Sequence, residues 1–157
     1  MDRKPITAKG YKKLQEELSQ LIKEERPKII NDIAVARSHG DLKENAEYHA
    51  AKEKQGFIEG RIQHLNAIIA DSEVVDVSKT EADDVRFGAT VTYEDLDSGE
   101  TASWKIVGEE ETDIENREIS IKSPIAQSLL GKEEGDEVVL RVPKGSIEVE
   151  IISVEYK

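Results

Sequence analysis

Two apolar stripes with helical spacing dominate the first half of this 157-residue chain. The first stripe comprises Tyr11, Leu14, Leu18, Leu21, Ile22, Ile29, Ile33 and Ala36. The second comprises Ala51, Ile58, Ile62, Leu65 and Ile69. Steps that alternate between three and four residues align side chains in one narrow seam, which is the pattern of coiled-coil packing. The sequence therefore predicts two long helices that pack through these seams.

A glycine separates the two stripes and indicates where the chain reverses. Gly40 follows the first stripe as a helix stop, and Asp41 is a candidate start for the next helix. If the chain folds back at Gly40, Ala36 falls near Asn45 and both seams are buried together. We expect an antiparallel hairpin with arms of roughly 30 residues, about 45 Å long.

Two residues of the first arm have specific expected roles. Thr7 is a plausible N-cap for the first helix. Pro27 lacks a backbone donor inside the helical pattern, so we expect it to bend the first arm.

Beyond about residue 74 the apolar period changes from helical spacing to alternation. The expected strands are Val85–Tyr93, Ala102–Val107, Glu118–Ile121, Glu137–Val142 and Ser146–Val154. A short helix is predicted after Ser123, because serine at the N-cap, Pro124 at the first helical position and Gly131 at the end have their preferred places. The predicted fold is therefore α+β, with a helical hairpin at residues 1–76 and a small globular domain at 77–157.

The charge differs between these halves. The chain has a net charge of −12; residues 1–76 hold 13 Lys and Arg against 14 Asp and Glu, and residues 77–157 hold 9 against 20. Only the near-neutral half could approach a polyanion without strong repulsion, so bulk charge does not predict a free-standing nucleic-acid binder.

The cysteine content and the lack of long apolar runs indicate where in the cell the protein is found. The chain has no cysteine, which excludes disulfides and thiolate metal sites and is compatible with a reducing cytosol. Its N-terminus lacks an apolar signal region, and no apolar run approaches membrane-spanning length. We therefore expect a cytoplasmic protein without membrane contact.

The acidic segment at the turn allows two interpretations. Asp41 and Glu44 have the spacing of a capping box, in which each residue satisfies a backbone donor of the other. They could also bind a hard cation, since Mg²⁺ is commonly held by one or two carboxylates together with substrate phosphates. Two carboxylates make only part of such a site, so any metal bound here would need ligands from a partner.

The other candidate groups give weaker signals. His39, His49 and His64 lack the spacing of a zinc site. Arg37, Lys43 and Lys52 are either ordinary solvated helix charges or a local patch that contacts phosphates. The few aromatic residues after residue 77 are enough for a small core and too few for an aromatic ligand pocket.

Two segments together resemble the signatures of the Gre family of transcript cleavage factors. These are Gly40–Tyr48, with the sequence GDLKENAEY, and Ser123–Lys132, with the sequence SPIAQSLLGK. The resemblance covers essentially the whole chain and implies an FKBP-like second domain with an antiparallel sheet. It also implies a transcription elongation factor that enters the secondary channel of backtracked bacterial RNA polymerase and stimulates cleavage of the nascent RNA 3′ end.

The family pattern implies roles for individual residues. Asp41 and Glu44 resemble the catalytic acids, which help to hold an Mg²⁺ shared with the polymerase and not tightly bound by the free factor. Asn45 and Tyr48 would support the tip, and Arg37 and Lys52 would contact the extruded RNA. Ser123, Pro124 and Ile125 resemble the polymerase-docking segment.

The resemblance implies a cofactor protein rather than an enzyme, and two alternatives stay open. One is a regulator that occupies the same channel without promoting cleavage. The other is a prolyl isomerase, suggested by the FKBP-like fold alone.

Overall fold

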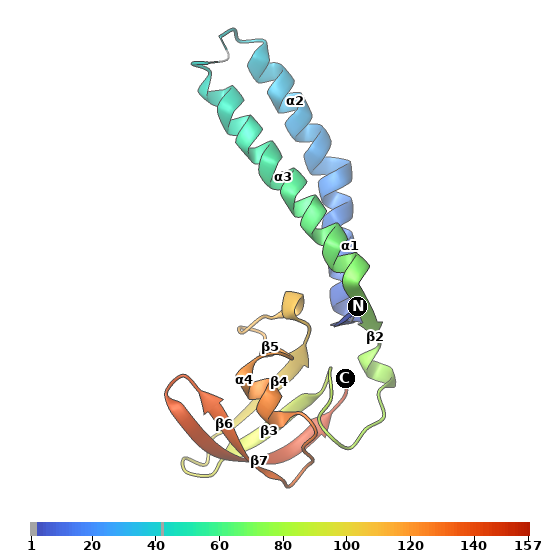
Figure 1. Cartoon of the computed structure of the whole chain (residues 1–157), viewed down its shortest axis with the longest axis vertical. Helices are drawn as coiled ribbons and strands as arrows, with labels where there is room; N and C mark the ends of the chain where they lie inside the picture. The colour runs from blue at the N-terminus through green and yellow to red at the C-terminus, as the bar shows by residue number, and fades with distance from the viewer. Residues whose placement is uncertain (1–2, 42) are drawn as a thin grey trace. The chain divides into compact units, whose positions relative to one another are not determined.

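The computed structural model describes residues 3–41 and 43–157, so Leu42 of the predicted tip lies outside the described residues. The described chain divides into two compact units (Figure 1). One unit consists of Tyr11–Asp71, and the other combines the residues up to Gly10 with Ser72–Lys157. The second unit thus includes an N-terminal segment and residues 72–76, which the sequence pattern placed with the hairpin. The α+β fold class is confirmed.

The hairpin unit consists of two antiparallel helical arms. The first arm is a continuous helix made of α1 (Ala8–Gln20), a π-helical turn η1 (Leu21–Glu25) and α2 (Arg26–Arg37). The second arm is α3 (Ala46–Asp71), whose 26 residues span about 39 Å. In Figure 1, α2 and α3 lie side by side.

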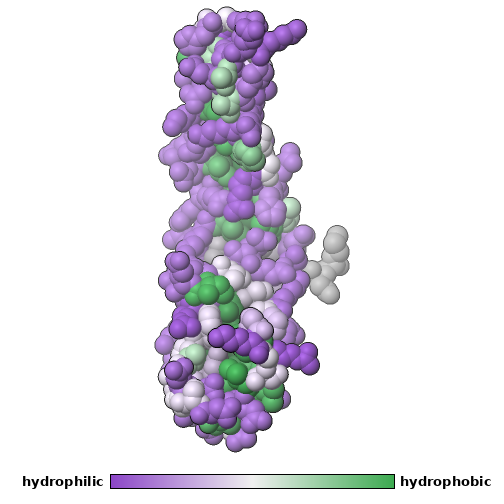
Figure 2. Space-filling model, turned by 90° about the vertical axis from the view of Figure 1, so that its left-hand side faces the viewer, coloured by the Kyte–Doolittle hydropathy of each residue, from purple (hydrophilic) through white to green (hydrophobic). Residues whose placement is uncertain are grey.

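The two predicted seams form the hairpin core. Ile29 and Ile33 of α2 pack with Ile58 and Ile62 of α3, and all four side chains are at least nine-tenths buried. Partly buried residues complete the cluster: Leu18, Leu21, Tyr48 and Ala51. Ile22 is the exception in the predicted stripe, since it remains 38% exposed. Figure 2 shows a broken line of hydrophobic side chains along the otherwise hydrophilic hairpin.

The π-helical turn accommodates Pro27. The Arg26 backbone N–H donates to the Leu21 carbonyl, five residues back, so the helix is locally wider just before the proline. A proline ring normally clashes with the carbonyl four residues before it, and the wider turn relieves that crowding. The expected disturbance at Pro27 is therefore a wide turn within a continuous helix.

Two arginine–glutamate pairs join the arms. Arg61 of α3 contacts Glu17 of α1 through Nε–Oε2 at 2.6 Å and Nη2–Oε1 at 3.0 Å. Arg26 and Glu59 form a similar fork, with both contacts at 2.9 Å. The hydrogen bonds from Arg61 hold the pKa of the Glu17 carboxyl below its usual range. Bidentate geometry of this kind fixes the register of the arms more than it adds stability.

The globular unit contains a two-stranded and a five-stranded sheet. β1 (Lys4–Thr7) pairs in parallel with β2 (Ser72–Val75). The larger sheet has the order β5-β4-β3-β7-β6 and consists of β3 (Thr90–Asp95), β4 (Thr101–Val107), β5 (Glu118–Ser120), β6 (Glu137–Val142) and β7 (Gly145–Glu155). Short 3-10 turns lie at Val77–Lys79 and Glu109–Glu111.

The larger sheet departs from the expectation in two ways. Its β4–β5 pair is parallel, so the sheet is mixed rather than wholly antiparallel. The expected strand at Val85–Tyr93 begins only at Thr90, because the chain turns at Gly88 with φ +88°. A side chain at position 88 would also lie 2.6 Å from a Val77 methyl group, so only glycine fits this turn.

The core of this unit lies under the helix α4 (Pro124–Leu129). Ala126 and Leu129 of α4 are fully buried, with Leu140 of β6 and Ile151 of β7 in the same cluster. The predicted start of this helix is confirmed: the Ser123 hydroxyl accepts the Ala126 N–H at 3.2 Å, and Pro124 follows the cap.

Besides its pairing with β2, the N-terminal strand is held in the globular unit by the Glu111 carboxylate at its end and by an ion pair of 3.3 Å between Lys4 and Glu109. Glu111 accepts hydrogen bonds from the Thr7 N–H at 3.1 Å, the Thr7 hydroxyl and the Gly108 N–H at 2.8 Å. The Thr7 hydroxyl in turn accepts the Gly10 N–H at 3.0 Å, which confirms Thr7 as the N-cap of α1. A β-carbon at Gly10 would overlap the Glu111 side chain, so a larger residue here would displace that carboxylate from its hydrogen bonds to Thr7.

The Glu17–Arg61 pair gives a pH-dependent prediction. Because the folded-state pKa of Glu17 is depressed, its contribution exists above the ordinary glutamate pKa of 4.5 and is lost as pH falls through the lower folded-state value. Glu17→Gln should lower the free energy of unfolding at neutral pH by up to about 1 kcal/mol, since the pair is partly exposed. Urea unfolding followed by circular dichroism should show a smaller difference between the two proteins at about pH 3 than at neutral pH.

The neighbouring exposed residue Glu16 provides the matched control. Glu16→Gln should leave stability unchanged at both pH values. A Glu17→Gln effect of equal size in acid and at neutral pH would contradict the assignment.

Candidate functional site at the hairpin tip

The hairpin reverses through a short loop between α2 and α3. Ser38 follows the last residue of α2, and its N–H donates to the Val35 carbonyl at 3.1 Å. Gly40 then adopts a φ of +114°. This left-handed conformation favours glycine, in agreement with the predicted helix stop. The second helix begins only at Ala46, so the segment that carries Asp41 and Glu44 is a loop.

The capping-box interpretation of Asp41 and Glu44 is therefore wrong. The Asp41 carboxylate accepts the Lys43 N–H at 2.9 Å, which closes a local turn before the helix. This is a common alternative for aspartate, whose short side chain competes with the helix for nearby backbone donors. The N-cap is Asn45, which the family resemblance had identified only as a supporting residue.

Asn45 links both arms of the hairpin. Its side-chain oxygen accepts the Tyr48 N–H at 3.0 Å, and its amide nitrogen donates to the Ala36 carbonyl at 2.6 Å. The Ala36 carbonyl also accepts the His39 N–H at 3.2 Å. The buried Ala36 thus accepts hydrogen bonds from residues near both ends of the loop. The predicted proximity of Ala36 and Asn45 is confirmed.

The two acids are exposed at this loop. Asp41 and Glu44 border a shallow depression together with His39, Asn45, Ala46 and Glu47. One Asp41 oxygen is used by Lys43, and among the described residues no donor engages the Glu44 carboxylate. Three of the four carboxylate oxygens thus receive no hydrogen bond from the described residues.

This donor set fits part of a magnesium site. Carboxylate oxygens are the ligands that Mg²⁺ prefers, and Mg²⁺ keeps several waters or substrate oxygens in its shell. In the described part of the chain, no group of three or more Asp, Glu, His or Cys side chains is arranged to hold a metal. Asp41 and Glu44 could therefore hold such an ion only with further ligands from outside the chain.

The remaining predicted tip residues are only partly brought together. The Arg37 guanidinium lies 6.0 Å from the centre of the Tyr48 ring, in the range of a weak cation–π contact. The partly buried Tyr48 also packs against the hairpin core. Lys52 lies further along α3, where its ammonium donates to Gln55 at 3.3 Å. Arg37 thus contacts Tyr48 at the tip. Lys52 lies near the tip in sequence, but its described contact is with Gln55 further along α3.

Sequence reasoning missed His49 as a tip residue. Its ring lies 5.6 Å from that of Tyr48, and its Nε2 atom lies 3.1 Å from the Lys43 carbonyl. This histidine lacks the spacing of a zinc site, but its position one turn after the N-cap Asn45 could have suggested a contact with the preceding loop.

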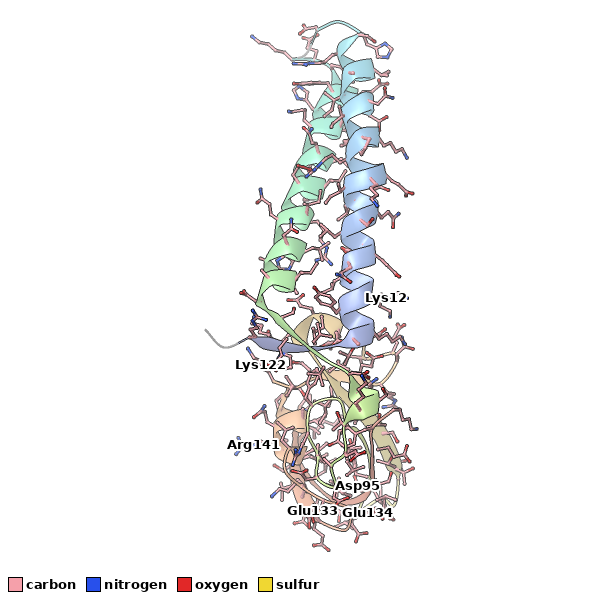
Figure 3. The ribbon with its side chains drawn as sticks, turned by 90° about the vertical axis from the view of Figure 1, so that its right-hand side faces the viewer. Lys12, Asp95, Lys122, Glu133, Glu134 and Arg141 are labelled. Carbon is pink, nitrogen blue, oxygen red and sulfur yellow. The ribbon has the colours of Figure 1, made fainter. Side chains whose placement is uncertain are left out.

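The predicted docking segment lies in the globular unit. Ser123 caps α4, the exposed Pro124 follows, and Ile125 packs partly buried against the core. Pro124 also borders a surface depression with Gln127 and with Arg141 of β6, which is labelled in Figure 3. These side chains have structural roles, and Pro124 is the member most open to a partner.

Comparison with known proteins places the whole chain in one group. Residues 4–74 match the family described as "Transcription elongation factor, N-terminal", and residues 79–156 match "Transcription elongation factor, GreA/GreB, C-term". The hairpin and its small globular unit thus define a transcription elongation factor. The chain belongs to the GreA/GreB family.

Individual relatives are similar over their full length. Transcription elongation factor GreA of Hyphomonas neptunium is 55% identical over 157 residues, which is 100% of both chains. The GreA protein of Francisella tularensis subsp. novicida is 54% identical, covering 99% of this chain and 98% of its own. Among solved structures, the GreA factor homolog 1 protein of Thermus thermophilus is 26% identical, with a TM-score of 0.45, and covers 98% of this chain and 99% of its own.

Among the described residues, no helix is both long and apolar enough to cross a bilayer.

The two roles of Asn45 can be separated by substitution. Asn45→Ala removes both the cap and the donor to Ala36, and should destabilise the start of α3 by about 1 kcal/mol. Asn45→Asp keeps the cap oxygen and loses only the donor. Hydrogen exchange of the Tyr48 amide, which donates to Asn45, should therefore accelerate in the alanine variant and stay slow in the aspartate variant.

Asn66→Ala is the matched control, because Asn66 is exposed within the same helix. It should not alter exchange at Tyr48. Unchanged Tyr48 protection in Asn45→Ala would show that Asn45 does not cap α3.

Proposed function

We propose that this chain binds backtracked bacterial RNA polymerase through its secondary channel and stimulates endonucleolytic cleavage of the nascent RNA 3′ end. Cleavage would remove the displaced RNA and allow elongation to resume. The observation that carries the proposal is the pair of exposed carboxylates, Asp41 and Glu44, in the loop at the hairpin apex. Membership of an elongation factor family supports it.

In this proposal the chain is a cofactor protein and not an enzyme by itself. Asp41 and Glu44 supply part of the shell of an Mg²⁺ ion whose other ligands come from the polymerase and the RNA. A second Mg²⁺ in such a centre would stabilise the attacking and leaving oxygens of the phosphodiester. The incomplete ligand set of the tip explains why both proteins are needed for the reaction.

The length of the arms supports delivery of these acids into a deep site. With α3 spanning about 39 Å, a narrow hairpin can carry a small loop well away from the residues at its other end. A hairpin of nearly balanced charge meets little repulsion near RNA, unlike the strongly acidic remainder of the chain.

Two further groups of residues have proposed contacts. Arg37 and Lys52 would contact phosphates of the extruded RNA, for which their exposure and charge are suited. Ser123, Pro124 and Ile125 would form part of the surface that docks on the polymerase, with Pro124 as the most exposed contact. Such a protein would act in the cytoplasm, where the polymerase is found.

The structure favours the main proposal over a prolyl isomerase. Trp104 and Tyr93 are joined by a hydrogen bond of 3.1 Å and pack in or against the core. The depression beside α4 is bordered by aliphatic and polar residues, including Gln127, Val139 and Arg141. An aromatic pocket for a proline side chain has no counterpart there.

Cleavage of RNA in a stalled, backtracked polymerase complex tests the proposal. Asp41→Asn with Glu44→Gln should lower stimulated cleavage by at least about 100-fold, because the metal shell loses both charged ligands. Binding to the polymerase should persist, since the double variant leaves the globular unit and the hairpin core unchanged.

Asp32→Asn with Glu53→Gln is the matched control. It makes the same chemical changes at exposed positions along the arms and should retain most of the activity. If the wild-type chain binds the complex but shortens no RNA, it is instead a channel-occupying regulator. Full cleavage by the Asp41/Glu44 variant would rule out the proposed role of these acids.

A further inference from the structure

The tip loop has a second tie to α3 besides Asn45. The Nε2 atom of His49 lies 3.1 Å from the Lys43 carbonyl oxygen, six residues earlier. A carbonyl oxygen can only accept, so this contact is a hydrogen bond when Nε2 carries the proton. The His49 N–H meanwhile donates to the Asn45 carbonyl at 3.1 Å, so the ring projects from a helical turn that is already fixed.

This bond completes the fixation of Lys43. Its N–H donates to the Asp41 carboxylate at 2.9 Å, and its carbonyl accepts from His49. Both backbone groups of Lys43 are therefore engaged, which gives this position a structural role that does not depend on its side chain. Through Lys43, His49 is connected to the turn that orients Asp41.

Glu44 lies between two fixed points as a result. On one side Lys43 is held by His49, and on the other Asn45 is held by Ala36 and Tyr48. A two-sided anchor restricts the backbone of an exposed residue that has no side-chain partner of its own among the described residues. Removal of either anchor should let the Glu44 carboxylate sample a wider range of positions.

We propose that His49 is a positioning residue, which donates from Nε2 to the Lys43 carbonyl and so holds Asp41 and Glu44 in the geometry that binds the shared cation. The inference rests on the proposed function for its effect on cleavage. The hydrogen bond between His49 and the Lys43 carbonyl, called the clasp below, is a property of the free chain. His49 touches neither the RNA nor the metal in this role. His49 instead restricts the conformational freedom of Asp41 and Glu44 before the chain binds the polymerase, which supplies the other metal ligands.

The other tip histidine provides an internal comparison. His39 is exposed and borders the same depression, and its only hydrogen bond among the described residues is from its backbone N–H to Ala36. The two residues thus share chemistry and location but differ in the bond from the ring. A general need for imidazole near the tip would affect both residues, whereas the clasp requires only His49.

Three variants test the clasp. His49→Leu removes the donor and keeps a residue of good helix propensity. His49→Gln restores an N–H donor at a similar distance from the backbone as Nε2. His39→Leu is the matched control for loss of an imidazole.

The first readout uses the free chain and needs no polymerase. Nitrogen-15 NMR of the rings should show His49 in the Nε2–H form, with slower exchange of that proton than in His39. Hydrogen exchange at the Lys43 amide should accelerate in His49→Leu and remain slow in His49→Gln and His39→Leu. An unprotonated Nε2 in neutral His49, or unchanged Lys43 exchange in His49→Leu, would overturn the clasp.

The second readout is stimulated cleavage as a function of Mg²⁺ concentration in backtracked complexes. His49→Leu should need about tenfold more Mg²⁺ for half-maximal cleavage, with polymerase binding unchanged. His49→Gln should recover most of the loss, and His39→Leu should behave as wild type. Wild-type Mg²⁺ dependence in His49→Leu, or no recovery in His49→Gln, would overturn the inference. If the wild-type chain itself stimulates no cleavage, the proposed function fails, and the NMR and exchange results still decide the clasp.

Discussion

The hydrogen bonds of Asn45 are the interaction on which the tip depends. One side chain starts α3 by accepting the Tyr48 N–H and joins it to α2 by donating to the Ala36 carbonyl. Ala36 is buried in the hairpin, so this link ties the exposed loop directly to packed structure. The apolar seams bring the arms together, but only a directional bond sets where the second helix begins. Because α3 begins after Asn45, Asp41 and Glu44 lie in the preceding loop, and neither carboxylate caps the helix.

The parts of the fold that follow from repeated patterns could be predicted from the sequence. Ile33 and Ile62 were recognised because many residues share their spacing, and Ser123 because it precedes a proline at the helix start. The start of α3 was predicted wrongly, because Asp41 and Asn45 are both good N-caps and the choice of Asn45 depends on a bond from one arm to the other, which the spacing within a single segment does not specify. The β1–β2 pair and the tie between Thr7 and Glu111 were missed for the same reason, since 104 residues separate the latter two.

In the candidate site, too, some residues could be predicted from the sequence and others could not. Asp41 and Glu44 were predicted as site residues because their residue type and place at a turn suit a hard cation, and the family resemblance implied a role for them. His49 was missed because a histidine that bonds a backbone carbonyl has no distinctive spacing. Its proposed role depends on a contact between the ring and the Lys43 carbonyl, which forms only in the folded loop. A surface site of this kind combines residues visible in sequence with supporting contacts that only the folded tip reveals.

In the proposed function, the tip acids act inside the catalytic centre of RNA polymerase. When Fe²⁺ replaces the catalytic Mg²⁺ in a backtracked complex and hydrogen peroxide is added, Fe²⁺ is oxidised to Fe³⁺ and the peroxide is split into hydroxide and a hydroxyl radical, which cuts any backbone near the ion. We expect cuts in this chain confined to the neighbourhood of residues 39–45. These cuts should disappear when the chain is left out of contact with the polymerase. Cuts confined to the globular unit, or none in a complex that demonstrably holds the factor, would contradict it.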